Sequence, residues 1–222
     1  GRNGLALRFV KYGAEREVVL RVDARSSKES TQRIAPRPAT PISRKRREAQ
    51  CKYRTQIDPD GRVIGASPGI LEVFEQIHPA TRIDGLAHVL ILGEPGVGKT
   101  HIAELIHKSS DRANKPFRAV NAGGSGGDLN IQRGEWVGFG KGHGLTGIDA
   151  KGRSGYLQHT HGGTLFVDEF ATMSPELQVI FLSVLEQRDV ERVGGDSFTP
   201  DVRCVFATNA DINAEVAAGR LR

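Results

Sequence analysis

Cysteine is scarce in this sequence, and its apolar runs are short. The two cysteines among 222 residues, Cys51 and Cys204, lie far apart and show no metal-ligand spacing, so we expect no disulfide framework. Uninterrupted apolar stretches such as residues 89–92 are far too short to cross a bilayer. The first residues also lack the apolar stretch of a signal peptide. We therefore expect a cytoplasmic protein with no membrane partner.

Charge is distributed unevenly along the chain. Residues 1–57 contain 15 Lys and Arg against 5 Asp and Glu, whereas residues 58–222 contain 16 against 21. The net charge of +5 thus combines a basic N-terminal quarter with a mildly acidic remainder. We accordingly divide the chain into an N-terminal segment, residues 1–57, and one globular domain, residues 58–222.

The N-terminal segment combines a hairpin pattern with a linker pattern. Apolar residues 5–10 and 18–22 predict a β-hairpin, which we interpret as the end of a domain upstream. Residues 26–50 contain three prolines and the cluster Arg44-Lys45-Arg46-Arg47, which is typical of a linker. This cluster either contacts DNA phosphates weakly or keeps the linker solvated. We favour the second interpretation, because no aromatic residues interleave for base stacking.

Strand and helix patterns alternate from residue 64 onward. Ser-Pro pairs at residues 67–68 and 174–175 predict helix starts, because proline suits the first helical position. The helix after residue 175 has apolar residues at helical spacing. The alternation predicts an α/β fold with a parallel sheet flanked by helices. The predicted strands cover residues 89–92, 117–120, 165–167 and 202–207.

The first chemical motif lies between the strand at residues 89–92 and an amphipathic helix. It matches the P-loop pattern G-x-x-x-x-G-K-[ST] at every position. Glycines allow backbone N–H groups to close around phosphates, and the helix N-terminus adds its positive dipole end. We expect Lys99 to contact the β- and γ-phosphates of ATP and Thr100 to bind Mg²⁺. The predicted nucleotide-binding residues are Gly93, Glu94, Pro95, Gly96, Val97, Gly98, Lys99 and Thr100.

A second motif, residues 162–169, ends an apolar strand in two carboxylates. Alone, such a pair is usually a solvated strand end. Behind a complete P-loop it predicts that Asp168 binds the metal ion and that Glu169 polarises a water for attack on the γ-phosphate. The glycine-rich residues 123–127 lack a following Lys-Ser/Thr, and we interpret them as a flexible connection.

These motifs resemble the central domain of sigma-54-dependent transcription activators, a branch of the AAA+ ATPases. Two further stretches match the same domain: Glu191-Arg192-Val193-Gly194-Gly195 and Ala207-Thr208-Asn209. The resemblance covers residues 60–222. It implies an ATPase that assembles into a homo-oligomer, usually a hexameric ring, and remodels sigma-54 RNA polymerase. Family members continue beyond the position of Arg222 with a small helical lid and a DNA-binding helix-turn-helix. We therefore expect DNA contacts through such regions or weakly through Arg44–Arg47.

The resemblance also implies individual roles. Asn121 matches the asparagine that holds the catalytic glutamate, here Glu169, and releases it when the γ-phosphate is sensed. Thr208 and Asn209 match the first sensor of the γ-phosphate. Arg222, in the sequence Gly-Arg-Leu-Arg, matches the arginine finger that enters the site of a neighbouring subunit. The predicted catalytic residues are therefore Asp168, Glu169, Asn121, Thr208, Asn209 and Arg222.

One loop departs from the family pattern. Members carry Gly-Ala-Phe-Thr-Gly-Ala on the loop that contacts sigma-54, whereas residues 142–148 read Gly-His-Gly-Leu-Thr-Gly-Ile. The loop is then one residue longer, and Leu145 replaces the phenylalanine. We expect weak coupling to sigma-54 or a different partner. Two alternatives stay open: an AAA+ remodeller of another protein, and a nucleotide-binding module without turnover.

Overall fold

The computed structural model describes residues 5–10, 17–24, 43–61, 68–82, 88–124, 128–141 and 152–221. These residues form a six-stranded sheet with the order β1-β2-β3-β8-β5-β4 and a separate two-stranded ribbon, β6-β7. All pairs of the main sheet are parallel except β1-β2. In the described part of the chain, no helix has the length and apolar character that a membrane crossing requires. The strands are β1 (Leu5–Val10), β2 (Glu17–Ala24), β3 (His88–Gly93), β4 (Phe117–Asn121), β5 (Thr164–Asp168), β6 (Val190–Glu191), β7 (Ser197–Phe198) and β8 (Arg203–Thr208).

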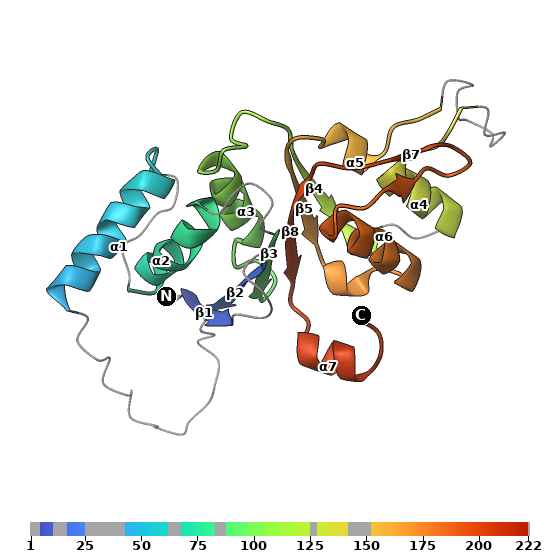
Figure 1. Ribbon diagram of the computed structural model, residues 1–222. Coiled ribbons are helices and arrows are strands. Elements are labelled where there is room, and N and C mark those ends of the chain that lie inside the picture. Colours follow the sequence, from blue (N-terminus) through green and yellow to red (C-terminus); the bar gives the residue numbers. More distant parts are fainter. Residues whose placement is uncertain are drawn as a thin grey trace.

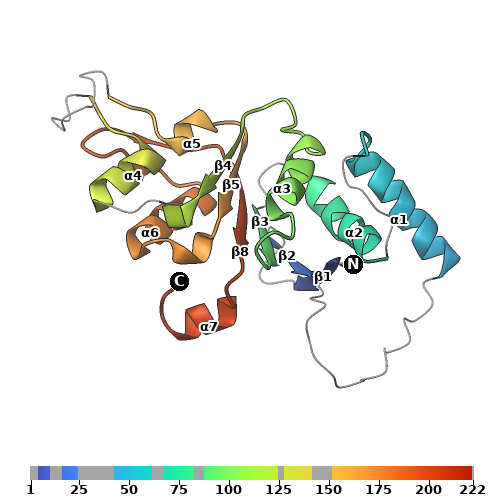
Figure 2. The same ribbon diagram turned by 180° about the vertical axis from the view of Figure 1, so that it is seen from behind.

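Helices cover both faces of the sheet, which confirms the predicted fold class. α1, α2 and α3 lie on one side, and α4, α5 and α6 lie on the other (Figures 1 and 2). The predicted helix starts are also borne out: Ser174 accepts from the Leu177 N–H at 3.4 Å and Pro175 follows it, while the other helix begins at Pro68. The helices are α1 (Arg44–Ile57), α2 (Pro68–Arg82), α3 (Lys99–Lys108), α4 (Leu129–Val137), α5 (Tyr156–His159), α6 (Pro175–Leu185) and α7 (Ile212–Ala217).

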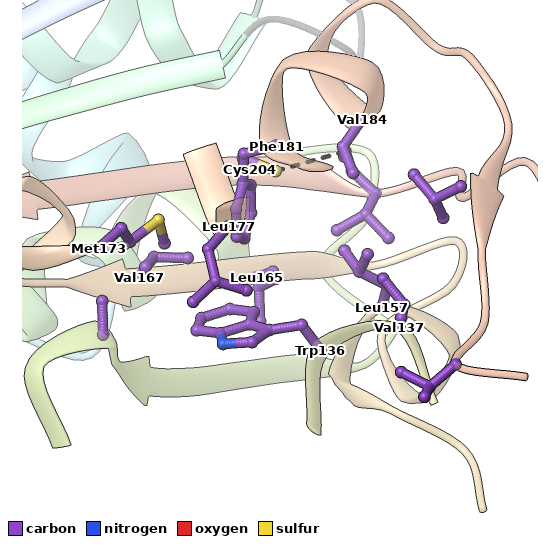
Figure 3. Close-up of a cluster of buried hydrophobic side chains, with 14 of the residues drawn as sticks. Trp136, Val137, Leu157, Leu165, Val167, Met173, Leu177, Phe181, Val184 and Cys204 are labelled. Carbon is purple, nitrogen blue, oxygen red and sulfur yellow. Dashed lines mark hydrogen bonds between the residues drawn. The ribbon is translucent and has the colours of Figure 1, made fainter. Parts of the chain in front are cut away.

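The central strands are buried on both faces, which explains their continuous apolar sequences. Successive side chains of a strand point to opposite faces. Along β5, Phe166 therefore packs with the core under α2 and α3, whereas Leu165 and Val167 pack with the core under α4 and α6. Figure 3 shows the second core, in which Trp136 of α4 meets Phe181 of α6 edge-on with ring centroids 5.1 Å apart. Two apolar cores thus hold the sheet rigidly between its helices.

The N-terminal segment is only partly as predicted. The hairpin β1-β2 forms, and β2 pairs in parallel with β3, so the hairpin extends the main sheet. Residues 44–57 form helix α1. The interpretation of residues 26–50 as a linker is therefore wrong for residues 44–50. The division of the chain near residue 58 remains a prediction.

Helix α1 is attached to α2 through one inward face. Arg46 pairs with Glu75 of α2, with Nη2 and Oε2 3.0 Å apart, and Gln50 donates from Nε2 to the same Oε2 at 2.7 Å. The Tyr53 ring stacks on His78 with centroids 4.1 Å apart. This face mixes charged, polar and apolar groups at helical spacing, so apolar periodicity alone does not reveal it. Its members are Arg46, Gln50, Tyr53 and Ile57.

A half-buried histidine begins β3 at the amino end of the sheet. His88 Nδ1 accepts a hydrogen bond from the Cys204 N–H at 3.1 Å, an arrangement that needs Nδ1 unprotonated. Burial lowers the pKa of His88 to about 4, and the positive charges of Arg203 and Arg112 act in the same direction. The folded protein therefore holds this imidazole neutral.

We expect His88 to reduce stability in mild acid. Because its folded pKa lies below the ordinary 6.5, its contribution is present above that pH and is lost as the pH falls toward 4. The loss amounts to about 2 kcal/mol of unfolding free energy between pH 7 and pH 5. Urea unfolding at both pH values should show a smaller loss for His88→Gln than for the unmodified chain. The exposed control His159→Gln should keep the full loss, and equal losses in all three would contradict the assignment.

Candidate functional site

The carboxyl ends of four neighbouring parallel strands meet at one edge of the sheet, in the order β3, β8, β5 and β4. Leu92 of β3 pairs with Thr208 of β8, and Asn121 of β4 pairs with Asp168 of β5. The P-loop, residues 93–100, follows β3 directly at the same edge. In open α/β sheets, ligands bind beyond these carboxyl ends. The structure thus brings together the predicted site residues that it describes.

The P-loop connects β3 to α3 through two glycines in the left-handed region. Gly96 has φ 78° and Gly98, the residue capping α3, has φ 89°. L-residues with side chains adopt such angles rarely. A Cβ at either position would meet no atom within 4 Å, so the space beside the loop is open. The N-terminal turn of α3 therefore directs its N–H groups toward an open cradle, as phosphate binding requires.

Lys99 and Thr100 occupy the first turn of α3. The Lys99 side chain is buried, and its Nζ donates to the backbone oxygens of Gly93 and Glu94, both at 3.1 Å. The ammonium group is therefore held against the loop itself, next to the open cradle. Thr100 is exposed and Asp168 is half-buried. A hydroxyl and a carboxylate are oxygen ligands of the kind that Mg²⁺ accepts, with water and phosphate completing its shell.

Glu169 has an unusual backbone conformation for a residue with a side chain. Its φ is 53°, in the left-handed region, where an L-residue costs about 1–2 kcal/mol. Its N–H donates to Asp168 Oδ1 at 2.9 Å, which helps to hold this turn. Strained residues of this kind concentrate at functional sites. The conformation turns the chain sharply between β5 and the short 3₁₀ turn Phe170–Thr172.

The side chains of Asn121 and Glu169 both lie close to Gly123. A Cβ on Gly123 would lie 2.8 Å from Glu169 Oε2 and 3.3 Å from Asn121 Oδ1. Asn121 Oδ1 also accepts from the Gly123 N–H at 2.7 Å. The predicted asparagine and glutamate are therefore close neighbours, although 48 residues separate them in the sequence.

The interpretation of residues 123–127 as a flexible connection is wrong for its first part. Ala122–Gly124 forms a 3₁₀ turn that packs against Glu169 and Thr172. The glycine at position 123 provides room for the Glu169 carboxylate. The sequence feature that could have indicated this role is a glycine two residues after the asparagine that ends a strand.

The two predicted sensor residues at the end of β8 differ in their exposure to solvent. Thr208 is buried, and its Oγ1 accepts from the Ala210 N–H at 3.1 Å. Asn209 is exposed at the same edge. Thr208 therefore lies within the sheet between the P-loop and Asp168, whereas Asn209 faces solvent.

The predicted arginine finger, Arg222, lies outside the described residues, but the segment leading to it is anchored. Gln178 of α6 donates from Nε2 to the carbonyl oxygen of Arg220 at 2.8 Å and to that of Met173 at 3.1 Å. The Arg220 guanidinium pairs with Glu215 of α7, with Nε and Oε2 2.7 Å apart. Sequence reasoning did not identify Gln178, because a single glutamine on a helix carries no motif.

The predicted partner loop, residues 142–148, also lies outside the described residues, and its flanks form a short ladder. The Phe139 N–H donates to the Arg153 oxygen at 2.7 Å, and the Gly140 N–H donates to the Val193 oxygen at 2.9 Å. A Cβ on Gly140 would lie 2.4 Å from the Gly195 Cα, so the backbones are in close contact. The motif at residues 191–195 therefore supports the base of this loop.

A P-loop between a strand and a helix, beside an acidic strand end and polar ends of the neighbouring strands, defines a P-loop fold of the AAA+ class. The model of the family described as the Sigma-54 interaction domain matches residues 63–222. The chain belongs to this family.

Relatives and solved structures agree with this assignment. The chain is 41% identical over 160 residues to the transcriptional regulatory protein XylR of Pseudomonas putida, covering 72% of this chain and 27% of that protein. It is 40% identical over 177 residues to the Nif-specific regulatory protein of Herbaspirillum seropedicae, covering 79% of this chain and 31% of that protein. It is also similar to the crystal structure of NtrX from Brucella abortus in complex with ATP, with a TM-score of 0.60, 31% identity, and coverage of 80% and 38%. The chain thus spans less than a third of the length of the two curated relatives.

Proposed function

We propose that this chain is the ATP-hydrolysing motor domain of a sigma-54-dependent transcription regulator and that it remodels sigma-54 RNA polymerase. The observation that carries the proposal is the alignment of a complete P-loop with Thr208, Asp168 and Asn121 along one sheet edge. Nucleotide binding is further supported by NtrX, a structural relative solved with ATP and with ADP. RNA polymerase as the partner also implies that the protein acts in the cytoplasm.

Each residue of the site has a definite task in this proposal. Lys99 moves its ammonium from the loop carbonyls to the β- and γ-phosphates, where charge-assisted hydrogen bonds are stronger. Thr100 and Asp168 would hold Mg²⁺, whose charge would offset that of the phosphates. Glu169 orients a water and accepts its proton, and Asn121 positions the Glu169 carboxylate. Thr208 and Asn209 respond to the presence of the γ-phosphate.

Hydrolysis requires assembly in this proposal. Arg222 would stabilise charge on the phosphoryl group in the site of a neighbouring subunit, as a guanidinium does in related reactions. The subunits would then form a homo-oligomeric ring, with six copies expected from the family. Activity per subunit should accordingly depend on protein concentration.

Binding to sigma-54 is tested by changing the loop of residues 142–148. An aromatic pair is worth roughly 0.5–1.5 kcal/mol beyond area burial, so Leu145 in place of phenylalanine should weaken sigma-54 binding roughly two- to tenfold. The full-length protein is titrated against sigma-54 with an ATP transition-state mimic, beside a variant whose residues 142–148 are replaced by Gly-Ala-Phe-Thr-Gly-Ala. We expect the replaced loop to bind more tightly and Leu145→Ala to bind more weakly than the natural loop.

The same titration, together with a measurement of ATP turnover, separates the alternative functions. Tight binding by the natural loop, unimproved by replacement, would contradict the importance of Leu145. No binding by any form favours a remodeller of a different protein, an alternative that the altered loop supports. ATP binding without turnover at any protein concentration would instead identify a nucleotide-binding module.

A further inference from the structure

Helix α1 presents an array of cations to solvent. The side chains of Arg44, Lys45, Arg47 and Lys52 are exposed. Glu48, the single acid in the sequence of this helix, pairs with Arg44 at 2.8 Å and leaves the excess of positive charge in place. Residues 58–222 are net acidic by five charges, the difference between their 21 acids and 16 bases. The basic character of the protein is therefore concentrated in the N-terminal segment, and α1 displays it on a helix.

The attachment of α1 to the domain fixes the direction of this array. Arg46 and Gln50 both bond to Glu75, and Ser109, which follows α3, donates from Oγ to the Ile57 oxygen at 3.0 Å. Burial raises the pKa of Glu75, but the hydrogen bonds from Arg46 and Gln50 outweigh it, so this pKa lies below its ordinary value. The anchoring carboxylate is ionised at neutral pH. The helix is thus held at both ends with its inner face covered.

Helical geometry places most of the exposed cations away from that inner face. With 100° per residue, Arg44, Lys45 and Lys52 lie about 120–160° around the helix from Gln50, whereas Arg47, although exposed, lies only about 60° from Gln50. Eight residues separate Arg44 from Lys52, which corresponds to about 12 Å along the helix axis. The array thus places four cations, one of them paired with Glu48, along a length over which a duplex presents about seven phosphate charges.

Other anionic partners fit this face less well. Binding to single strands relies on aromatic side chains that stack on bases. The only aromatic residue in the α1 sequence is Tyr53, whose ring is stacked on His78 of α2. A helix that lies in a membrane surface exposes an apolar face. Ile57 is only 2% exposed, so the one large aliphatic side chain of α1 is already turned into the domain.

We propose that the exposed face of α1 is a binding surface for the phosphate backbone of double-stranded DNA, without base specificity. The surface lies on the helix that docks against α2 and is independent of the nucleotide site. Fixing the cations on a docked helix removes part of the entropy that a flexible tail would lose on binding. Binding should be strong only at low salt, because it rests on counterion release.

The test measures fluorescence anisotropy of a short labelled duplex of mixed sequence, without nucleotide, over a range of NaCl concentrations. The variant Lys45→Gln/Arg47→Gln/Lys52→Gln removes three exposed cations and leaves the Arg46–Glu75 anchor in place. We expect affinity at low salt to fall roughly tenfold or more, and the salt slope of log Kobs to decrease by about 2.7 for three lost contacts. The charge-matched control Lys115→Gln/Lys141→Gln/Arg188→Gln, at exposed positions elsewhere, should retain both.

Several results would overturn the proposal. One is the absence of duplex binding at low salt, and another is an unchanged salt slope in the α1 variant. Equal weakening by the control triple would show that net charge alone governs binding. Stronger binding to phosphatidylserine vesicles, or to a single strand of the same sequence, would assign the surface to a membrane or to unpaired nucleic acid. Because no nucleotide is present, none of these results depends on the ATPase proposal.

Discussion

Lys99→Ala is expected to weaken ATP binding roughly hundredfold or more. The substitution removes a point charge at the β- and γ-phosphates, and hydrogen bonds to charged groups each contribute about 1.5–3 kcal/mol. The position of Lys99 favours phosphate binding, because its Nζ lies 3.1 Å from the Gly93 and Glu94 oxygens, next to the open cradle.

The measurement is a titration with a fluorescent ATP analogue in the presence of Mg²⁺. Lys108→Ala provides the matched control, since Lys108 ends the same helix and only pairs with Glu104 at the surface, with Nζ and Oε2 3.9 Å apart. This control should bind as the unmodified chain does. Circular dichroism of both variants checks that α3 is retained. Equal affinity of Lys99→Ala and the unmodified chain would remove the P-loop assignment.

Glu169→Gln is expected to retain ATP and to reduce turnover roughly 10²–10⁴-fold, the usual contribution of a general base. Glutamine keeps the shape of the side chain but cannot accept the proton of the attacking water. The neighbouring Asn121 and the left-handed backbone at Glu169 are unchanged by this substitution, so the geometry of the site is preserved. Binding and catalysis are thereby separated.

Turnover of the full-length protein is followed by phosphate release, at protein concentrations where the rate per subunit no longer rises. Glu176→Gln, an exposed acid in the first turn of α6, is the control and should hydrolyse normally. If Glu169→Gln hydrolysed at the unmodified rate, another group would have to activate the water. If it lost nucleotide, Glu169 would act in binding.

The sheet and its chemical edge were predictable because their signals are local. Residues 93–100 contain a complete motif, and the apolar sequences of β3, β5 and β8 reflect burial on both faces. The conformation of Glu169 was not predictable, because a φ of 53° is rare for a residue with a side chain and no sequence motif specifies it. The same holds for Gly123, whose role depends on the approach of Glu169.

Helix α1 was missed for a different reason. Its sequence is dominated by charge, and its inner face includes Arg46 and Gln50, which no apolar pattern would select. Both residues are stabilised by Glu75, 29 and 25 residues later in the chain. A polar anchor between helices becomes recognisable only when both partners are known. The two-residue strands β6 and β7 are likewise too short to leave a period in the sequence.

Gln178 has a consequence for communication between subunits. Its side chain joins the Met173 oxygen, four residues after Glu169, to the Arg220 oxygen, two residues before Arg222. In a closed ring assembled as proposed, the segment with Glu169 and Met173 would face the subunit's own nucleotide. The segment with Arg220 and Arg222 would face the nucleotide of the neighbouring subunit. One amide thus bridges the receiving and the transmitting side of a subunit. Because every copy has these two sides in the same order, this bridge would couple each nucleotide site to the next around the whole ring, and the coupling would act equally in both senses.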